Sequence, residues 1–333
     1  YPAPGTPPAR AMRYTVYHLT HFRYDAPVSE SVMEVRMQPR TESVQRCLRF
    51  ELSTTPRAHV FAYQEPEGNI VHHFDVPARH RELTIVAESV VEFVSDIAVP
   101  LSVDRGVWTL LDEEGTKERF YELLEPSHFA RPTEALKAFG GNLGLSREDD
   151  PLTLLRRLND QMYDSFEYAP KSTRVDSPID EAIEARRGVC QDFAHVMIAL
   201  VRAAGIPCRY VSGYLYHNHK GDERSVDGAS HAWVEAWLPS LGWVGFDPTN
   251  RTMATDRHIR VAIGRDYYDV PPNRGAFKGN ARSELGVAVR VQTTDAPIEP
   301  SDVMPALYWQ APEPDVAPLL NDDEQEQQQQ QQQ

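Results

Sequence analysis

The sequence has few cysteines, no long hydrophobic run and no excess of basic residues. Its three cysteines cannot all pair within one chain, and none stands at a CxxC or other zinc-ligand spacing. This pattern is consistent with a reducing compartment, and we expect neither a metal nor a cofactor. No segment approaches the roughly 18 uninterrupted apolar residues of a membrane helix. A net charge of −15 argues against nucleic acid or an anionic membrane surface as the main partner.

The two ends of the chain have compositions that do not build a core. Residues 1–12 are rich in proline and lack the charged region and apolar run that mark a signal peptide. We therefore predict a disordered leader and a cytoplasmic location. Residues 296–333 are rich in proline and acidic residues and end in a run of glutamines, so this tail is predicted to be largely disordered.

Residues 13–105 are predicted to form an N-terminal antiparallel β-sandwich. The chain has 333 residues and is 41% hydrophobic, which is enough for two domains. In this first part, short runs rich in β-branched and aromatic residues recur between turn signals such as Glu67-Gly68-Asn69. The runs cover residues 14–24, 30–38, 48–54, 60–64, 70–76 and 83–94.

Residues 106–295 follow a junction marked by proline and charge, and they are predicted to form a second domain that makes the whole protein α+β. The hydrophobic period becomes helical over residues 116–124, 133–139, 151–166 and 179–186. Pro151 suits the first turn of its helix, and Asp150 before it suits the capping position. Strand patterns follow over residues 209–216, 230–237, 242–250 and 285–292.

A cysteine stands in the first turn of one further predicted helix. Apolar residues recur with a helical period from residue 189 to residue 204, between Gly188 and Gly205. The exposed N–H groups and the positive end of the helix dipole favour the thiolate form of Cys190. A lone cysteine is more often a buried structural residue, so a catalytic interpretation depends on its partners.

Two strand-like segments further along the chain carry a histidine and an aspartate. If Trp237 pairs with Leu241 across a three-residue loop, His231 lies directly opposite Asp247 on one face of an antiparallel ladder. A slip of one residue would place the two side chains on opposite faces, whereas a slip of two would leave a diagonal contact. This register predicts a hydrogen bond between Asp247 and His231.

Cys190, His231 and Asp247 together form a set suited to thiol catalysis. An imidazole can hold the thiolate as an ion pair and later protonate a leaving amine. A carboxylate on the other ring nitrogen fixes the tautomer and the orientation. Taken singly, each residue also has a structural interpretation, since His231 lies in a strand and Asp247 precedes Pro248 at a turn.

Four motifs resemble, in the same order, those of the transglutaminase-like superfamily of papain-like cysteine enzymes. They are Gly188-Val-Cys190-Gln-Asp-Phe-Ala-His195, Gly205-Ile-Pro207-Cys-Arg-Tyr-Val-Ser-Gly-Tyr214, Ser230-His231-Ala-Trp-Val-Glu235 and Gly242-Trp-Val-Gly-Phe-Asp247-Pro-Thr-Asn250. The likeness is to the bacterial branch with an N-terminal β domain, whose members are described as candidate cysteine proteases, and it extends over residues 13–291. It implies a papain-like core with Cys190 as nucleophile, His231 as base and Asp247 as orienting acid.

The shared chemistry that this resemblance implies is acyl transfer through a thioester. The backbone N–H of Cys190 and a second donor would bind the oxyanion, and Tyr168 and Gln191 are the candidates for that donor. Asp192 belongs to the family motif, and we expect it to support the site.

Two aromatic residues near the set have other expected roles. Trp233 falls on the His231 face of its strand, where it either shields the site from water or is an ordinary core residue. His195 lies about 140° around the helix from Cys190, so we expect a structural role for it and not that of the base.

Three functions remain open from the sequence. The first is hydrolysis of a peptide or protein substrate by a peptidase or amidase, which we favour. The second is transfer of an amine to a glutamine side chain, as in a transglutaminase. The third is an inactive binding module on the same fold, which the intact set of three residues disfavours.

Overall fold

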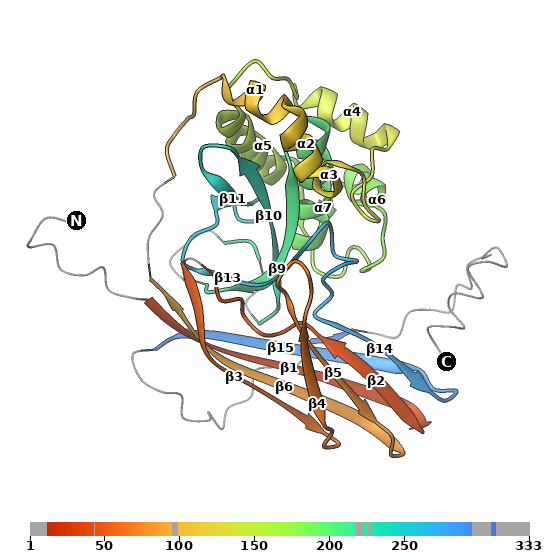
Figure 1. Cartoon of the computed structure of the whole chain (residues 1–333). Helices are drawn as coiled ribbons and strands as arrows, with labels where there is room; N and C mark the ends of the chain where they lie inside the picture. The colour runs from red at the N-terminus through yellow and green to blue at the C-terminus, as the bar shows by residue number, and fades with distance from the viewer. Residues whose placement is uncertain are drawn as a thin grey trace, which may run out of the picture. The chain divides into compact units, whose positions relative to one another are not determined.

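The computed structural model describes residues 12–42, 44–94, 99–217, 223–225, 228–294 and 308–310 (Figure 1). The predicted leader, apart from Met12, and the predicted tail, apart from residues 308–310, lie outside these ranges. The chain forms two compact units. One contains Phe93–Val270, and the other combines Arg13–Glu92 with the segment that begins at Pro271. Among the described residues, no helix is both long and apolar enough to cross a membrane.

The β unit is a sandwich of two antiparallel sheets, which confirms the predicted fold of this region. The first sheet has the strand order β16 (Tyr308–Gln310), β15 (Ser283–Thr293), β1 (Met12–Val28), β6 (His80–Phe93) and β3 (Gln45–Thr55). The second has the order β14 (Asn273–Lys278), β2 (Glu30–Val35), β5 (Ile70–Val76) and β4 (Val60–Gln64). Strand β6 alternates buried and less buried residues, and Leu83, Ile85 and Ala87 face the core that Phe74 completes from β5.

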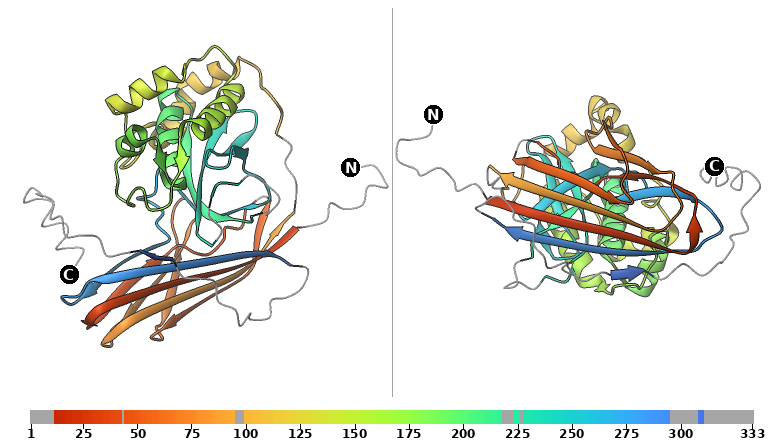
Figure 2. Two further views of the ribbon diagram at one scale, coloured as in Figure 1. Left: turned by 180° about the vertical axis from the view of Figure 1, so that it is seen from behind. Right: turned by 90° about the horizontal axis from the view of Figure 1, so that it is seen from below.

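Strands from the C-terminal part of the chain complete both sheets of this unit. β15 pairs with β1 along eleven residue pairs, and β14 pairs with β2. Figure 2 shows β15, β1 and β6 side by side. The chain therefore leaves the β unit and returns to it, so the unit differs from the contiguous ranges 13–105 and 106–295 that the sequence suggested. The physical reason is that a strand pattern marks a strand but does not identify its partner.

The second unit packs helices against a five-stranded antiparallel sheet whose strand order differs from the chain order. Its helices are α1 (Val107–Asp112), α2 (Glu114–Arg119), α3 (Tyr121–Leu124), α4 (Glu134–Asn142), α5 (Pro151–Ser165), α6 (Ile179–Ala185) and α7 (Cys190–Ala203). Its sheet has the order β12 (Thr252–Met253), β11 (Gly242–Asp247), β10 (His231–Leu238), β9 (Cys208–Leu215) and β13 (His258–Gly264). A short parallel pair, β7 (Glu167–Tyr168) and β8 (Arg187–Gly188), precedes α7.

The helix predictions are confirmed with two differences. The pattern over residues 116–124 forms two short helices because the chain departs from helical geometry at Phe120, whose ring packs 4.5 Å from that of Trp237. Helix α1 lies in the junction and was not predicted. Asp150 caps α5 by accepting hydrogen bonds from the N–H groups of Leu152 and Thr153, with Pro151 at the first helical position.

Helix α7 is the centre of the second unit. It is buried along most of its length, and it packs on β9 and β10. Phe193, Val196 and Met197 share one hydrophobic cluster with Ala232 and Val234 of β10. The first residue of a central, buried helix is thereby held close to the sheet, and that residue is Cys190.

Candidate active site

Cys190 occupies the first position of α7, and its surroundings explain why the helix begins there. The carboxylate of Asp192 accepts hydrogen bonds from the Val189 N–H at 2.8 Å and from the Thr173 hydroxyl at 2.6 Å. Gly188 leaves room for this cap, because a Cβ at that position would lie 2.8 Å from the Cβ of Asp192. Asp192 therefore fixes the start of the helix. The half-buried Cys190 carries a free thiol.

The hairpin of β10 and β11 has a register that differs by two residues from the predicted one. Trp237 pairs with Trp243, and Leu238 pairs with Gly242, so the predicted pairing of Trp237 with Leu241 is wrong. The turn explains the shift, since the Leu241 N–H bonds to the Leu238 carbonyl and Gly242 follows with a φ of 76°. A slip of two preserves the face, so His231 and Asp247 meet diagonally.

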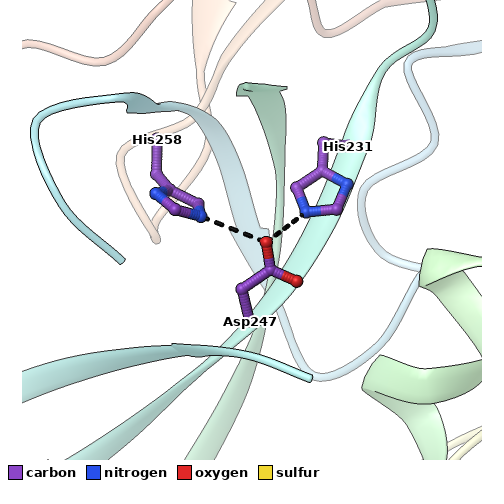
Figure 3. A group of neighbouring side chains, drawn as sticks. All are labelled: His231, Asp247 and His258. Carbon is purple, nitrogen blue, oxygen red and sulfur yellow. Dashed lines mark hydrogen bonds and ion pairs between the residues drawn. The ribbon is translucent and has the colours of Figure 1, made fainter. Parts of the chain in front are cut away.

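The predicted hydrogen bond between these two residues is present. His231 Nε2 lies 2.8 Å from Asp247 Oδ2 (Figure 3). The same oxygen accepts from the side-chain amide of Asn250 at 2.8 Å, while Oδ1 accepts the backbone N–H groups of Thr249 and Asn250. Burial would raise the pKa of Asp247, but the charge and hydrogen bond of His231, with a smaller contribution from His258, hold it well below its usual range. The carboxylate is thus ionised although its side chain is fully buried.

His231 has two partners that favour its charged form. Burial alone would lower its pKa, but the charge and hydrogen bond of Asp247, together with a hydrogen bond and charge from Cys190, raise it to about 10. Because Nε2 faces Asp247, Nδ1 is the ring nitrogen left for Cys190. The structure therefore brings Cys190, His231 and Asp247 together, with the imidazole between the thiol and the carboxylate.

Trp233 and His195 are both buried, but in different surroundings. Trp233 is fully buried, and its ring centroid lies 6.1 Å from that of His231 in a stacked arrangement. His195 stacks on Phe129 at 5.0 Å and accepts the N–H of Tyr267, and burial lowers its pKa to about 3. A neutral ring held in this way suits structural support.

The two candidate oxyanion donors lie near the start of α7. Tyr168 pairs in parallel with Gly188, two residues before Cys190, and its ring stacks on Phe193. The side-chain amide of Gln191 donates to the Val175 carbonyl at 2.7 Å. One amide hydrogen of Gln191 is therefore engaged by the loop before α6.

That loop borders a polar cavity of about 330 Å³. Its lining residues are Lys171, Ser172, Thr173, Arg174, Asp176, Ser177, Pro178 and Glu181. The hydrogen bonds from Thr173 to Asp192 and from Gln191 to Val175 tie this loop to the first turn of α7. The cavity is therefore linked to the start of α7 through Thr173, although neither Cys190 nor His231 lines it.

His258 is a member of the site that the sequence interpretation did not single out. Its Nε2 lies 3.2 Å from Asp247 Oδ2, so the three side chains of His231, Asp247 and His258 form one buried cluster (Figure 3). The residue lies at the start of β13, which reaches the site by pairing with β9. The segment from His258 to Asp266 resembles the bacterial branch of the family, but that resemblance does not show which residue His258 contacts.

The ligand atoms of this cluster lie within 4.8 Å of one another, a spacing that a metal ion would accept. The hydrogen bonds do not fit a metal. Nδ1 of His258 accepts the N–H of Thr255 at 3.1 Å, so the proton of a neutral ring sits on Nε2, the atom that faces Asp247. A protonated Nε2 donates a hydrogen bond and has no lone pair for a metal.

A helix that begins with a cysteine, packed on an antiparallel sheet that carries a His–Asp pair, defines a papain-like, transglutaminase-like fold. Residues 143–248 match the transglutaminase-like superfamily, and residues 14–92 match the bacterial transglutaminase-like N-terminal region. The chain belongs to the transglutaminase-like superfamily, in its bacterial form with an N-terminal β domain.

The chain is also similar to individual proteins. An uncharacterized protein of Mycobacterium leprae is 35% identical over 280 residues, which are 84% of this chain and 98% of the relative. The crystal structure of a candidate cysteine protease from Cytophaga hutchinsonii has a TM-score of 0.68 and 23% identity, and the match covers 91% of this chain and 99% of that one. A protein-glutamine gamma-glutamyltransferase of Pseudomonas aeruginosa is 36% identical over 104 residues, 29% of this chain and 15% of that protein.

Proposed function

We propose that this protein catalyses acyl transfer at a peptide or carboxamide bond through a thioester on Cys190. One observation carries the proposal. A buried imidazole has a carboxylate on Nε2 at 2.8 Å and the Cys190 thiol as its other hydrogen-bond partner. This arrangement supplies a nucleophile, a proton carrier and an orienting group in contact.

The reaction proceeds in two halves. The Cys190 thiolate attacks the carbonyl carbon, and the imidazolium of His231 protonates the leaving nitrogen as the C–N bond breaks, which yields a thioester and a free amine. In the second half, His231 takes a proton from water, and the resulting hydroxide attacks the thioester. The products are a carboxylic acid and the regenerated pair of Cys190 thiolate and His231 imidazolium. Asp247 keeps the ring oriented throughout and is not itself protonated.

The negative oxygen of each tetrahedral intermediate requires donors. The backbone N–H of Cys190 suits this role, because the first N–H groups of a helix have no partner within the helix. Tyr168 and the second amide hydrogen of Gln191, whose other hydrogen donates to the Val175 carbonyl, are the candidates for the second donor. Trp233 shields one side of His231 from water.

Hydrolysis is the reaction that we favour. Amine transfer is the second candidate, and the similarity of 104 residues to a protein-glutamine gamma-glutamyltransferase supports it. An amine would then replace water in the second half of the reaction. We further propose a peptide or protein substrate and a cytoplasmic location, with no role in binding nucleic acid or membranes.

Mass spectrometry of candidate peptides, incubated with the protein in the presence and absence of a primary amine, tests this function. We expect water-dependent cleavage or deamidation by the wild type and none by Cys190→Ala. Incorporation of the amine would show that the reaction is amine transfer and not hydrolysis.

Alkylation of Cys190 tests the thiol chemistry without a known substrate. We expect iodoacetamide to modify Cys190 rapidly at pH 6, because His231 holds the thiolate, and Cys208 to react far more slowly because it is fully buried. A Cys190 that is inert to iodoacetamide near neutral pH, together with no reacting peptide, would contradict the proposed function.

A further inference from the structure

We propose that His258 is a positioning residue, which holds the Asp247 carboxylate in the orientation that His231 requires. The proposal rests on the function proposed above for Cys190, His231 and Asp247. It assigns a role to a residue that does not touch the reacting atoms.

The geometry of Asp247 shows why a further donor matters. Oδ1 is held by two backbone N–H groups, which fix one end of the carboxylate. The planar carboxylate can still pivot about these hydrogen bonds and displace Oδ2, the oxygen that binds His231, unless Oδ2 has donors of its own. His258 Nε2 and the Asn250 amide approach Oδ2 at 3.2 Å and 2.8 Å, and together with His231 they give it three partners.

His258 is itself held by contacts that leave it little freedom. Its Nδ1 accepts the Thr255 N–H, and its own backbone N–H donates to the Thr255 carbonyl at 3.0 Å. Its ring packs edge-on against Trp233, with centroids 5.3 Å apart. The side chain is 1% exposed. A donor that cannot move is able to transmit its position to the carboxylate.

The charge state of His258 is as important as its position. The groups that face it are Asp247, His231 and Arg257, and Trp233 covers it from β10. Burial lowers the pKa of His258, and its hydrogen bond to Asp247 only partly offsets this. A neutral N–H donor orients the carboxylate without placing a second positive charge beside it. Asp247 therefore keeps its negative charge for the His231 imidazolium.

The tautomer is tested on the wild-type protein, and a variant serves only to assign the signals. NMR of protein labelled with ¹⁵N-histidine should show one neutral ring with a proton on Nε2 and none on Nδ1, unchanged between pH 5.5 and 8. Loss of these signals in His258→Gln would assign them. A ring that titrates in this range, or that carries its proton on Nδ1, would overturn the proposal.

The effect on the site is tested by the pH profile of Cys190 alkylation, followed by mass spectrometry of the Cys190 peptide. We expect His258→Ala to slow alkylation at pH 6 about ten- to a hundred-fold, the size expected for losing a hydrogen bond to a charged group, and to move the acid limb to higher pH. His258→Gln should recover most of the rate, because its amide can donate from nearly the same place. His80→Gln is the matched control, since His80 is also buried with two ring hydrogen bonds but lies in the β unit.

The outcomes separate this inference from the proposed function. If the wild type shows rapid alkylation at pH 6 and His258→Ala shows the same profile, the positioning role fails while the proposed function stands. Equal losses in His258→Ala and His258→Gln would also overturn the role, because they would indicate packing alone. Stoichiometric binding of Zn²⁺ to the wild type that both variants abolish would overturn it in favour of a metal site. A wild type in which Cys190 is inert to iodoacetamide near neutral pH, and which reacts with no peptide, would contradict the proposed function itself.

Discussion

Two buried histidines, one in each unit of this protein, differ in charge at neutral pH, because one ring is neutral and the other is protonated. His18 of the β unit and His231 of the second unit are 1% and 4% exposed. Burial lowers the pKa of His18 to about 4, whereas the pKa of His231 is raised to about 10. The partner of His18 Nε2 is the Thr20 hydroxyl at 3.3 Å, and that of His231 Nε2 is the Asp247 carboxylate at 2.8 Å.

The comparison teaches that burial and hydrogen bonding do not by themselves make a reactive histidine. Removing a ring from water disfavours its positive charge, and a neutral hydroxyl does not restore it. A buried carboxylate reverses the outcome. His195, five positions after Cys190 in α7, shows that a nearby carboxylate is not sufficient, because burial lowers its pKa to about 3 although the charge of the buried Asp266 opposes this shift.

Replacing the carboxylate should produce the largest effect. Asp247→Asn leaves a hydrogen bond to His231 but removes the charge, so His231 should become neutral, as His18 is. We expect turnover of a reactive peptide to fall ~10³- to 10⁴-fold, as for an orienting aspartate in a serine protease triad. Asp75→Asn, an exposed carboxylate of β5, is the control and should behave as the wild type. Full activity in Asp247→Asn would contradict the conclusion that the charge of Asp247 is what makes His231 differ from His18.

The charge of His231 should also make the free energy of unfolding depend on pH, an effect of intermediate size. The pKa of His231 is raised above its unfolded value of about 6.5, so its contribution is complete below that pH and is lost as the pH rises through about 10. We expect the free energy of unfolding to fall between pH 7 and 10 with a slope of at most about 1.4 kcal/mol per pH unit from this residue.

Urea unfolding followed by tryptophan fluorescence measures this slope, because four of the five tryptophans (Trp108, Trp233, Trp237 and Trp243) lie in the second unit. Asp247→Asn should lose this alkaline component. An identical slope in the wild type and in the variant would contradict the assignment of the charge to His231.

His18 should show the smallest effect, with the opposite dependence on pH. Because the pKa of His18 is lowered, its folded state favours the neutral ring, and stability is lost as the pH falls from about 6.5 through about 4. His18→Gln should cost about 1 kcal/mol at pH 7, a typical size for a buried polar substitution, and should reduce the acid-induced loss. Thermal unfolding at pH 5 and 7 measures both. Slower Cys190 alkylation in this variant would show that His18 is not purely structural.

The local elements of the site were predictable, because they follow from short-range patterns. The apolar period and Gly188 placed Cys190 at the start of a helix, and strand-like segments on either side of a turn carried His231 and Asp247. The register of their hairpin was not predictable to the residue, because Gly242 adopts a left-handed conformation that shifts the pairing by two. The predicted contact between His231 and Asp247 is nevertheless present, because a shift of two residues keeps both side chains on the same face of the sheet.

The sequence by itself determined the helix, the strands, the three residues of the thiol–imidazole–carboxylate set and the family. Each depends on neighbours within a few positions or on a motif. Only the tertiary structure decided which strands completed the β unit, that His258 reaches Asp247, and that His231 is charged while His18 is neutral. These properties depend on partners distant in the sequence and on the exclusion of water. No local pattern records either of them.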